Sequence, residues 1–344
     1  MFNEYADAVI AEIRDRQKEL EMNMSARDAV NTLYIGGGTP SVLPLDVLSR
    51  IVGAVTEPAE VTSPFEEFTI EVNPEDIVEK GSEYVRGLMN LGVNRISMGI
   101  QSFNDDILRW MNRRHDASRA VEAFRILRES GVLNISIDLI FGISQLTDEI
   151  WENTIEKALE LSPEHISAYQ LSIEEGSALA KMVADGRYVE ATDEQCRRLY
   201  DILCQSLRLA GYHHYEISNF AKPGFEAIHN SAYWRRAPYI GLGPGAHSLT
   251  GNIRSWNSQK LPHRNIVTYS RNFETLSPED IRVERIMLSL RTDKGLETTE
   301  LYSLADRTVI ETLLNEGALE LHGTRIRIPE DRLFTSDEII RELI

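Results

Sequence analysis

Apolar and polar positions in the first half of the chain alternate between short apolar runs and longer helical patterns. The short runs are rich in β-branched and aromatic residues, which is typical of buried strands. They predict strands at Thr32–Gly36, Glu67–Asn73, Arg95–Gln101, Asn134–Phe141 and His165–Ile173. Apolar residues at helical spacing predict helices between them, at Leu45–Val55, Ile77–Leu91, Ser118–Ser130 and Asp148–Leu161. This alternation indicates βαβ units and a parallel sheet.

Further elements flank this alternation. The pattern predicts an opening helix at Asn3–Glu21 and a strand at Tyr212–Phe220. Thr192 and Gln195 have the spacing of a capping box, which would begin a helix that ends at Gly211. From Ser277 onward the pattern predicts a compact helical segment, two strands at Ala318–His322 and Arg325–Pro329, and a last helix. This C-terminal segment resembles a small winged-helix unit.

Polar residues stand where three of the predicted parallel strands end. Glu71, Gln101 and Asp138 occupy these positions, and Gly36–Gly38 follows the first strand. Ligands of parallel α/β folds bind at the C-terminal ends of strands. A structural ion pair could satisfy Glu71 or Asp138 singly, but three polar groups beside a triple glycine favour a ligand site. Arg113 is a candidate cation for either carboxylate or for the carboxylate of a ligand.

The histidines suggest a second kind of site. His229 stands in the run His229-Asn230-Ser231-Ala232-Tyr233-Trp234, and His247 follows the glycine loop Gly241–Gly245. Histidine among aromatic residues suits a flat metal-bearing ligand such as heme. The alternative is a polar loop held by a hydrogen-bonded histidine. Successive residues of a strand face opposite sides, so at most one of His213 and His214 points inward.

Composition excludes several classes of partner. The formal net charge of −18 argues against nucleic acid and anionic membranes, and the segment from Ser277 carries nine basic against fifteen acidic side chains. No apolar run is long enough to cross a bilayer, and Met1–Leu20 is unlike a signal peptide. Cys196 and Cys204 lie on one predicted helix, too far apart to share a metal, and two cysteines fit a reducing cytoplasm.

Four motifs together resemble one known family. They are Gly36-Gly37-Gly38-Thr39-Pro40, Glu71-Val72-Asn73-Pro74, Asn94-Arg95-Ile96-Ser97-Met98-Gly99-Ile100-Gln101-Ser102-Phe103 and Ile137-Asp138-Leu139-Ile140-Phe141-Gly142. In order and spacing they resemble the oxygen-independent coproporphyrinogen III oxidase family of radical SAM proteins. The stretches Tyr212–Phe220 and His229–Trp234 further resemble its heme-chaperone (HemW-type) branch.

The resemblance implies roles for particular residues. Its S-adenosyl-L-methionine (SAM) ligands would be Gly37, Gly38, Thr39, Glu71, Gln101, Arg113 and Asp138. His229 would bind heme, with His247 as the reserve candidate, and no residue is assigned a catalytic role.

The resemblance also implies a [4Fe–4S] cluster that this chain cannot hold. Family members begin with a strand and a Cys-x-x-x-Cys-x-x-Cys loop, whereas this chain opens on the helix that should follow that loop. We expect a truncated chain, or else a degenerate paralogue, that is inactive in SAM cleavage. The functional hypotheses are a heme chaperone that passes heme to acceptor proteins, a decarboxylating oxidase of coproporphyrinogen III, and an inert scaffold.

The expected architecture is an incomplete parallel (β/α)6-type radical SAM barrel with a winged-helix-like C-terminal domain. We expect a barrel over residues 1–210, an extension with the porphyrin-site motifs over residues 211–276, and the small domain over residues 277–344. Thr32–Gly36 should be an exposed sheet edge or be covered by a second copy of the chain, so a homodimer is possible.

Overall fold

The computed structural model describes residues 2–24, 29–56, 65–258 and 269–344. Its centre is a seven-stranded sheet in the order β1-β2-β3-β4-β5-β7-β6. The first five strands are parallel, each beside the next along the chain: β1 (Thr32–Ile35), β2 (Glu67–Val72), β3 (Arg95–Gln101), β4 (Ile135–Phe141) and β5 (His165–Gln170). The predicted parallel sheet is therefore confirmed, and β1 lies at its edge.

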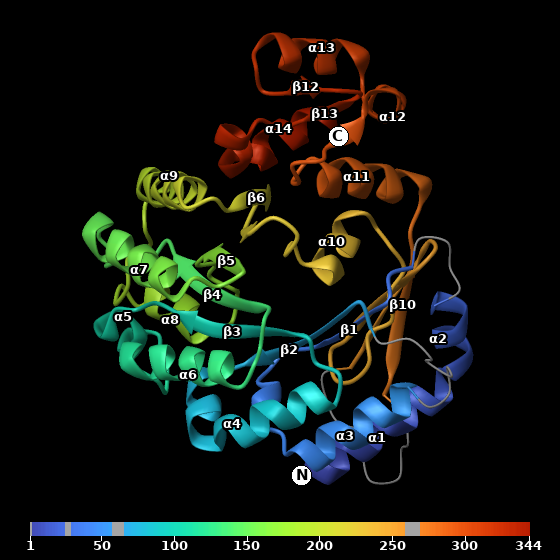
Figure 1. The fold of residues 1–344 in the computed structure, drawn as a ribbon. Helices are drawn as coiled ribbons and strands as arrows, with labels where there is room; N and C mark the ends of the chain where they lie inside the picture. The colour runs from blue at the N-terminus through green and yellow to red at the C-terminus, as the bar shows by residue number, and fades with distance from the viewer. Residues whose placement is uncertain (1, 25–28, 57–64, 259–268) are drawn as a thin grey trace.

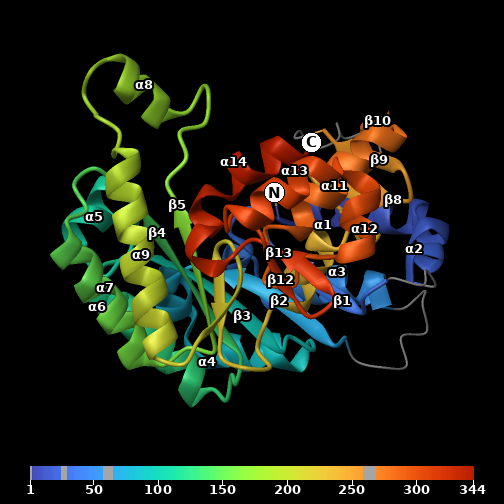
Figure 2. The ribbon, with the colours of Figure 1, turned by 90° about the horizontal axis from the view of Figure 1, so that it is seen from above.

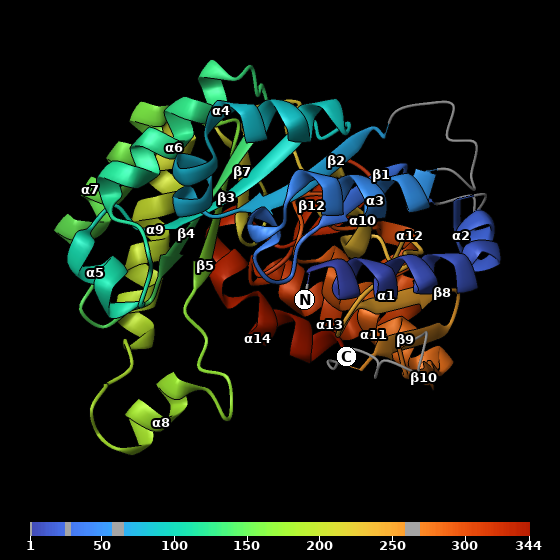
Figure 3. The same ribbon diagram turned by 90° about the horizontal axis from the view of Figure 1, so that it is seen from below.

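Helices cover the outer face of this sheet, as Figures 1 and 3 show. They are α3 (Leu45–Thr56), α4 (Pro74–Asn90), α5 (Asp105–Trp110), α6 (Ala117–Glu129), α7 (Asp148–Leu161) and α9 (Asp193–Leu209). The alternation along β3 explains the arrangement: Ile96, Met98 and Ile100 are fully buried in the apolar core, whereas Arg95 and Ser97 face the opposite side. The inner face of the sheet is consequently polar.

The opening helix is interrupted, contrary to the sequence prediction. Helix α1 (Phe2–Asp15) and helix α2 (Gln17–Met24) are separated by the single residue Arg16. Arg16 is buried and donates to Glu12, to the carbonyl oxygen of Gly241 at 2.7 Å and to Ser248 Oγ at 3.1 Å. This buried charge satisfies its hydrogen bonds on a distant loop, and the helix turns to allow it.

The sequence prediction was also wrong about the chain after β5. Helix α8 (Ala178–Ala184) lies on an excursion away from the body (Figures 2 and 3) and was not predicted. Thr192 does cap α9, but Gln195 donates to Ile143, Ser144 and Leu146 instead of completing a capping box. The single strand expected at residues 212–220 is an antiparallel hairpin of β6 (His213–Glu216) and β7 (Asn219–Ala221). His213 is exposed and His214 is buried on it, as strand geometry requires.

A second sheet and a second core complete the fold. The strands β8 (His247–Thr250), β9 (Ile253–Asn257) and β10 (Arg271–Thr275) form an antiparallel sheet that the sequence analysis missed. The second apolar core lies within residues 286–343. Its elements are α11 (Pro278–Ser289), β11 (Leu296–Glu297), α12 (Thr298–Leu304), α13 (Arg307–Asn315), β12 (Glu320–His322), β13 (Arg325–Arg327) and α14 (Ser336–Leu343).

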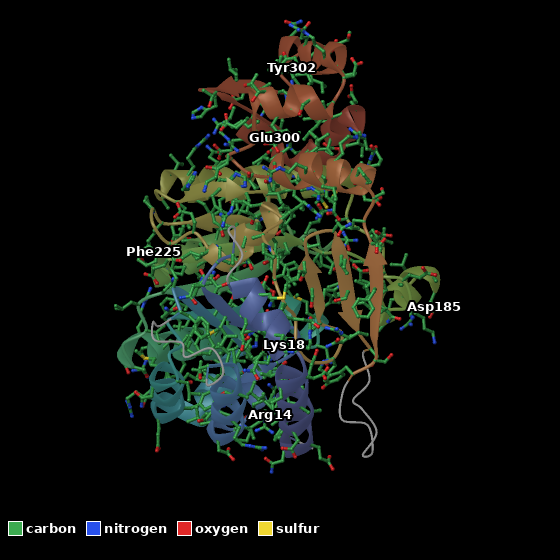
Figure 4. The ribbon with its side chains drawn as sticks, turned by 90° about the vertical axis from the view of Figure 1, so that its right-hand side faces the viewer. Arg14, Lys18, Asp185, Phe225, Glu300 and Tyr302 are labelled. Atoms are coloured by element: carbon green, nitrogen blue, oxygen red, sulfur yellow. The ribbon has the colours of Figure 1, made fainter. Side chains whose placement is uncertain are left out.

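This C-terminal unit lies at one end of the molecule. Glu300 and Tyr302 mark it in Figure 4, far from Arg14 and Lys18 on the opening helices. Three short strands and four helices give it the expected winged-helix-like character. Within the described residues, no helix combines the length and apolarity that a membrane crossing requires.

Candidate functional site

The glycine turn after β1 is tied to the next strand by Glu71. The Tyr34 hydroxyl donates to Glu71 Oε1 at 2.7 Å, and the backbone N–H of Gly37 donates to Oε2 at 3.0 Å. A Cβ on Gly36 would lie 2.5 Å from Glu71 Oε1, so any larger residue would displace the Glu71 side chain, and Gly37 has a φ of 91°. Burial, and next the charge of Glu71, raise the pKa of Tyr34, which therefore remains a hydrogen-bond donor. The glycine turn is exposed, which leaves its backbone open to a ligand.

Asp138 lies on the inner face of β4, and its pKa is well above the usual value for an aspartate. Burial raises its pKa to about 6, the charge of Arg95 acts in the opposite direction, and Ser97 Oγ donates to its Oδ1 at 3.2 Å. Arg95 is only 2% exposed, and its Nε is buried without a hydrogen-bond partner in the described part of the chain. The inner face thus holds the half-buried carboxylate of Asp138 and the buried guanidinium of Arg95, which are not joined by a described ion pair.

Gln101 and Arg113 converge above Gly99. Arg113 Nη2 donates to the Gly99 carbonyl oxygen at 2.9 Å, and Gln101 has a φ of 71° where β3 leaves its register with β4. A Cβ on Gly99 would meet Gln101 Nε2 at 2.8 Å and Arg113 Nη2 at 3.0 Å. Burial lowers the pKa of Arg113, and Asp138 opposes this shift by its charge.

The residues predicted to bind SAM therefore lie together at the C-terminal ends of the parallel strands. Gly37 and Glu71 are in contact, Asn73 links Thr39 to the end of β2, and Asp138 interacts electrostatically with both Glu71 and Arg113. Gly38 faces open space, since a Cβ added to it would have no other atom within 4 Å. Their role as SAM ligands stays a prediction.

His229 lies on a helix, whereas the alternative to heme binding in the sequence analysis placed it in a polar loop. Helix α10 (Ile228–Trp234) packs against the edge strand β1 on the inner side of the sheet (Figure 1). His229 Nδ1 is 2.8 Å from Thr32 Oγ1, its Nε2 is 2.8 Å from the Tyr233 hydroxyl, and its ring stacks on Tyr34 with centroids 5.0 Å apart. Burial and, more weakly, the charge of Arg95 lower the pKa of His229, so its imidazole is neutral at physiological pH.

Glu67 holds the helix that carries His229. Its carboxylate accepts from the backbone N–H of Ile228 at 2.7 Å and from that of His229 at 3.1 Å. Because Glu67 begins β2, this contact fixes the start of α10 to the sheet, and it is the charge-assisted kind of hydrogen bond that is strongest in proteins.

An apolar cavity of about 680 Å³ adjoins β1 and His229. Its walls come from α1, α3, β1, α10, the segment from Tyr239 to Leu242, β8 and α11. His229 and His247 both line it, and Tyr233, 39% exposed, lines it beside them. Trp234, which was expected beside a porphyrin together with Tyr233, instead lines a different cavity of about 810 Å³ between β6, α10 and the C-terminal unit.

The cysteines form no metal site. Cys196 is buried and Cys204 half-buried on α9, and burial raises the pKa of both thiols, that of Cys204 to about 12. Across the described ranges, no three His, Cys, Asp or Glu side chains are grouped so as to hold a metal ion. The residues of this chain therefore do not fit a [4Fe–4S] cluster.

Three residues that shape both sites escaped the sequence analysis. Tyr34, Glu67 and Arg95 were counted only as strand positions. Glu67 and Arg95 precede the buried Phe68 and Ile96, and Tyr34 lies between the half-buried Leu33 and Ile35, so their common position on the inner face could have been read from the period of two.

Comparison with known proteins agrees with this geometry. Residues 7–158 match the Radical SAM superfamily. A protein of Mycobacterium tuberculosis named heme chaperone HemW is 31% identical over 361 aligned positions, which cover 100% of this chain and 90% of that protein. Heme chaperone HemW of Bacillus subtilis is 35% identical over 273 positions, which cover 78% of this chain and 71% of that protein.

A solved structure has the same fold. Coproporphyrinogen III oxidase (HemN) of Escherichia coli, a radical SAM enzyme, superposes with a TM-score of 0.73 at 21% identity, over 97% of this chain and 83% of that one. At this identity the likeness concerns the fold alone, and it confirms the predicted incomplete radical SAM barrel. The sequence matches show that this chain belongs to the radical SAM superfamily and, within it, to the HemW family.

Proposed function

We propose that this protein is a heme chaperone that binds heme and SAM and passes heme to acceptor proteins. The observation that carries the proposal is that both candidate histidines line one apolar cavity, whose volume of about 680 Å³ is of the size that organic ligands occupy. The name shared by the curated relatives supports the same function.

His229 is the proposed axial ligand of the heme iron. A neutral imidazole is a good iron ligand, and the stacked Tyr34 and the bond to Thr32 hold the ring in place. Its Nε2 would bind iron only after the Tyr233 hydroxyl leaves it, and Tyr233 is exposed enough to rotate away. His247, exposed and stacked on Trp256, remains the reserve ligand.

Heme titration of His229→Gln tests this role. Glutamine keeps a polar side chain of similar reach between Thr32 and Tyr233, so the melting temperature should stay close to that of the parent. We expect the Soret shift on heme addition to disappear in His229→Gln and to persist in His247→Gln. A His229→Gln variant that titrates like the parent would contradict the assignment, and a parent that binds no heme would refute the chaperone function and leave the inert scaffold.

SAM is the second proposed ligand, and its site is at the C-terminal ends of strands β1 to β4. Glu71 and Asp138 would accept hydrogen bonds from ribose hydroxyls or the methionyl ammonium, Arg113 would donate to the carboxylate, and the backbone of Gly37–Thr39 would approach the ligand closely. SAM supplies radical chemistry only where a cluster reduces it, so we propose binding by these residues and no radical step.

Calorimetry with SAM tests this site. The double variant Glu71→Gln with Asp138→Asn should lose binding, because both acceptors become amides at unchanged size. The control is Glu66→Gln, since Glu66 is exposed and its side chain makes no described hydrogen bond. Equal SAM affinity in the double variant and the parent would show that the two carboxylates are structural.

The oxidase alternative rests only on the fold shared with coproporphyrinogen III oxidase. The residues of this chain give it no support, because its two cysteines could not hold a cluster. We propose in addition that the edge strand β1 allows a homodimer, because an unpaired edge favours association. Light scattering would refute the dimer if it found only monomer at micromolar concentration. The two unpaired cysteines support a cytoplasmic location.

A further inference from the structure

Arg236 stands between the two cavities of the inner side. It lines the cavity of about 680 Å³ that holds His229 and also the cavity of about 810 Å³ beside the C-terminal unit, and within the described ranges no other residue lines both. It follows α10 directly and has a φ of 55°, a left-handed conformation that costs a residue with a Cβ roughly 1–2 kcal/mol. This conformation ends the helix, since the backbone N–H groups of Arg236 and Ala237 donate to the carbonyl oxygens of Tyr233 and Ala232, and it places the Arg236 side chain in the wall of both cavities.

The guanidinium of Arg236 is only partly satisfied. Its side chain is 12% exposed, and its Nε donates to Glu284 Oε2 at 2.7 Å. Its Nη2 is buried without a hydrogen-bond partner among the described residues. A buried charged donor without an acceptor is costly, so this position favours a ligand that brings one.

The charges around Arg236 also favour an anion. Glu284, on α11, pairs with Arg254 as well as with Arg236, so one carboxylate serves two guanidiniums on the wall of the His229 cavity. Burial lowers the pKa of Arg236, and the charges of Arg254 and Arg285 lower it further. Arg285 is paired with Glu300, and the second partner of Arg254, Glu274, lies outside the cavity lining. Among the described residues that line the His229 cavity, two guanidiniums therefore share one carboxylate.

We propose that Arg236, supported by Arg254, binds a carboxylate of the ligand that occupies the His229 cavity. This inference rests on the proposed function, and for heme the carboxylate is a propionate. A porphyrin carries its iron at the centre and its propionates along one side, so an imidazole on the wall and a guanidinium at the cavity's polar end fix its orientation. Arg236 Nη2 donates to the propionate, while Nε stays bonded to Glu284, whose carboxylate competes with the propionate for the charge of Arg236 and Arg254.

The test compares heme with its dimethyl ester, which has the same ring and iron but no propionate charge. We expect the parent to bind heme about tenfold to a hundredfold more tightly than the ester, the range of one or two hydrogen bonds to a charged group. Arg236→Gln should bind the ester as the parent does and should lose the preference for heme. The control is Arg235→Gln, since the neighbouring Arg235 is exposed and lines only the other cavity.

A second variant tests the proposal even if Arg236→Gln does not fold. Glu284→Gln removes the carboxylate that competes for both guanidiniums, so the preference for heme over the ester should increase severalfold. If the parent binds both compounds equally, or Arg236→Gln keeps the full preference, the carboxylate role is wrong while heme binding stands. If the parent binds neither compound, the proposed function itself fails and the inference fails with it.

Discussion

Replacing Glu67 with glutamine should weaken heme binding through the helix that carries His229. Glu67 accepts two backbone N–H groups at the start of α10, at 2.7 and 3.1 Å. Hydrogen bonds to a charged group contribute about 1.5–3 kcal/mol each. Glutamine keeps one acceptor oxygen and turns an amide donor toward the other N–H, so we expect a loss of about 2 kcal/mol. If that free energy must be spent on reforming α10 before heme binds, the dissociation constant rises about 30-fold.

The assay is a Soret titration of Glu67→Gln with a thermal melt in parallel, and Glu66→Gln is the matched control. The exposed Glu66 precedes Glu67 directly, so its replacement makes the same chemical change without touching α10. The reasoning would be refuted if Glu67→Gln bound heme with the parent's affinity although its melting temperature fell. That result would mean that His229 is positioned by its ring contacts to Tyr34 and Thr32 and not by the cap.

Three further predictions concern single side chains. Tyr233→Phe removes the hydroxyl that occupies His229 Nε2, so heme affinity should rise about fivefold, the worth of one neutral hydrogen bond; a fall in affinity would exclude Nε2 as the iron ligand. Burial raises the pKa of Asp138 to about 6, so its ionisation destabilises the fold as pH rises from about 4 through 6. Asp138→Asn should therefore increase the free energy of unfolding at pH 8, by at most about 3 kcal/mol, and raise the melting temperature there but not at pH 4. An equal rise in melting temperature at pH 4 and pH 8 would contradict this direction. Burial likewise raises the pKa of Glu216 to about 7 and leaves its Oε1 without a described partner, so Glu216→Gln should stabilise the protein at pH 8.5 and not at pH 5, as differential scanning fluorimetry would show.

The parallel strands could be predicted because their outer faces are continuously apolar. Ile96, Met98 and Ile100 show a core-facing strand without knowledge of its neighbours. The strand β10 could not be found in this way, because four of its five residues are exposed and its sequence has no buried side. The alternation of apolar and polar residues cannot reveal a strand that has no buried face.

The candidate site was predictable in its members and not in its contacts. Glu71 and Asp138 were recognisable as carboxylates at strand ends, but the donors that satisfy them, Tyr34 and Ser97, are set by the register of neighbouring strands. Helix α10 was missed because its first turn is satisfied by Glu67, which lies 161 residues earlier in the chain. A local capping residue would have signalled that helix, and a distant one does not.

Arg16 has a consequence for the order in which the chain can fold. Strands β1 to β5 each add to the strand made just before, so the sheet can grow as the polypeptide leaves the ribosome. Arg16 must instead wait for Gly241, 225 residues later, which takes about ten to fifty seconds at usual rates of synthesis. The apolar side of α1 packs on α3 and does not depend on that loop, but until then the Arg16 guanidinium lacks its acceptors at Gly241 and Ser248, and closing so long a loop is entropically costly. The nascent protein therefore passes through a stage in which the parallel strands and the contact of α1 with α3 can form while the charge of Arg16 is still without its partners on the Gly241 loop.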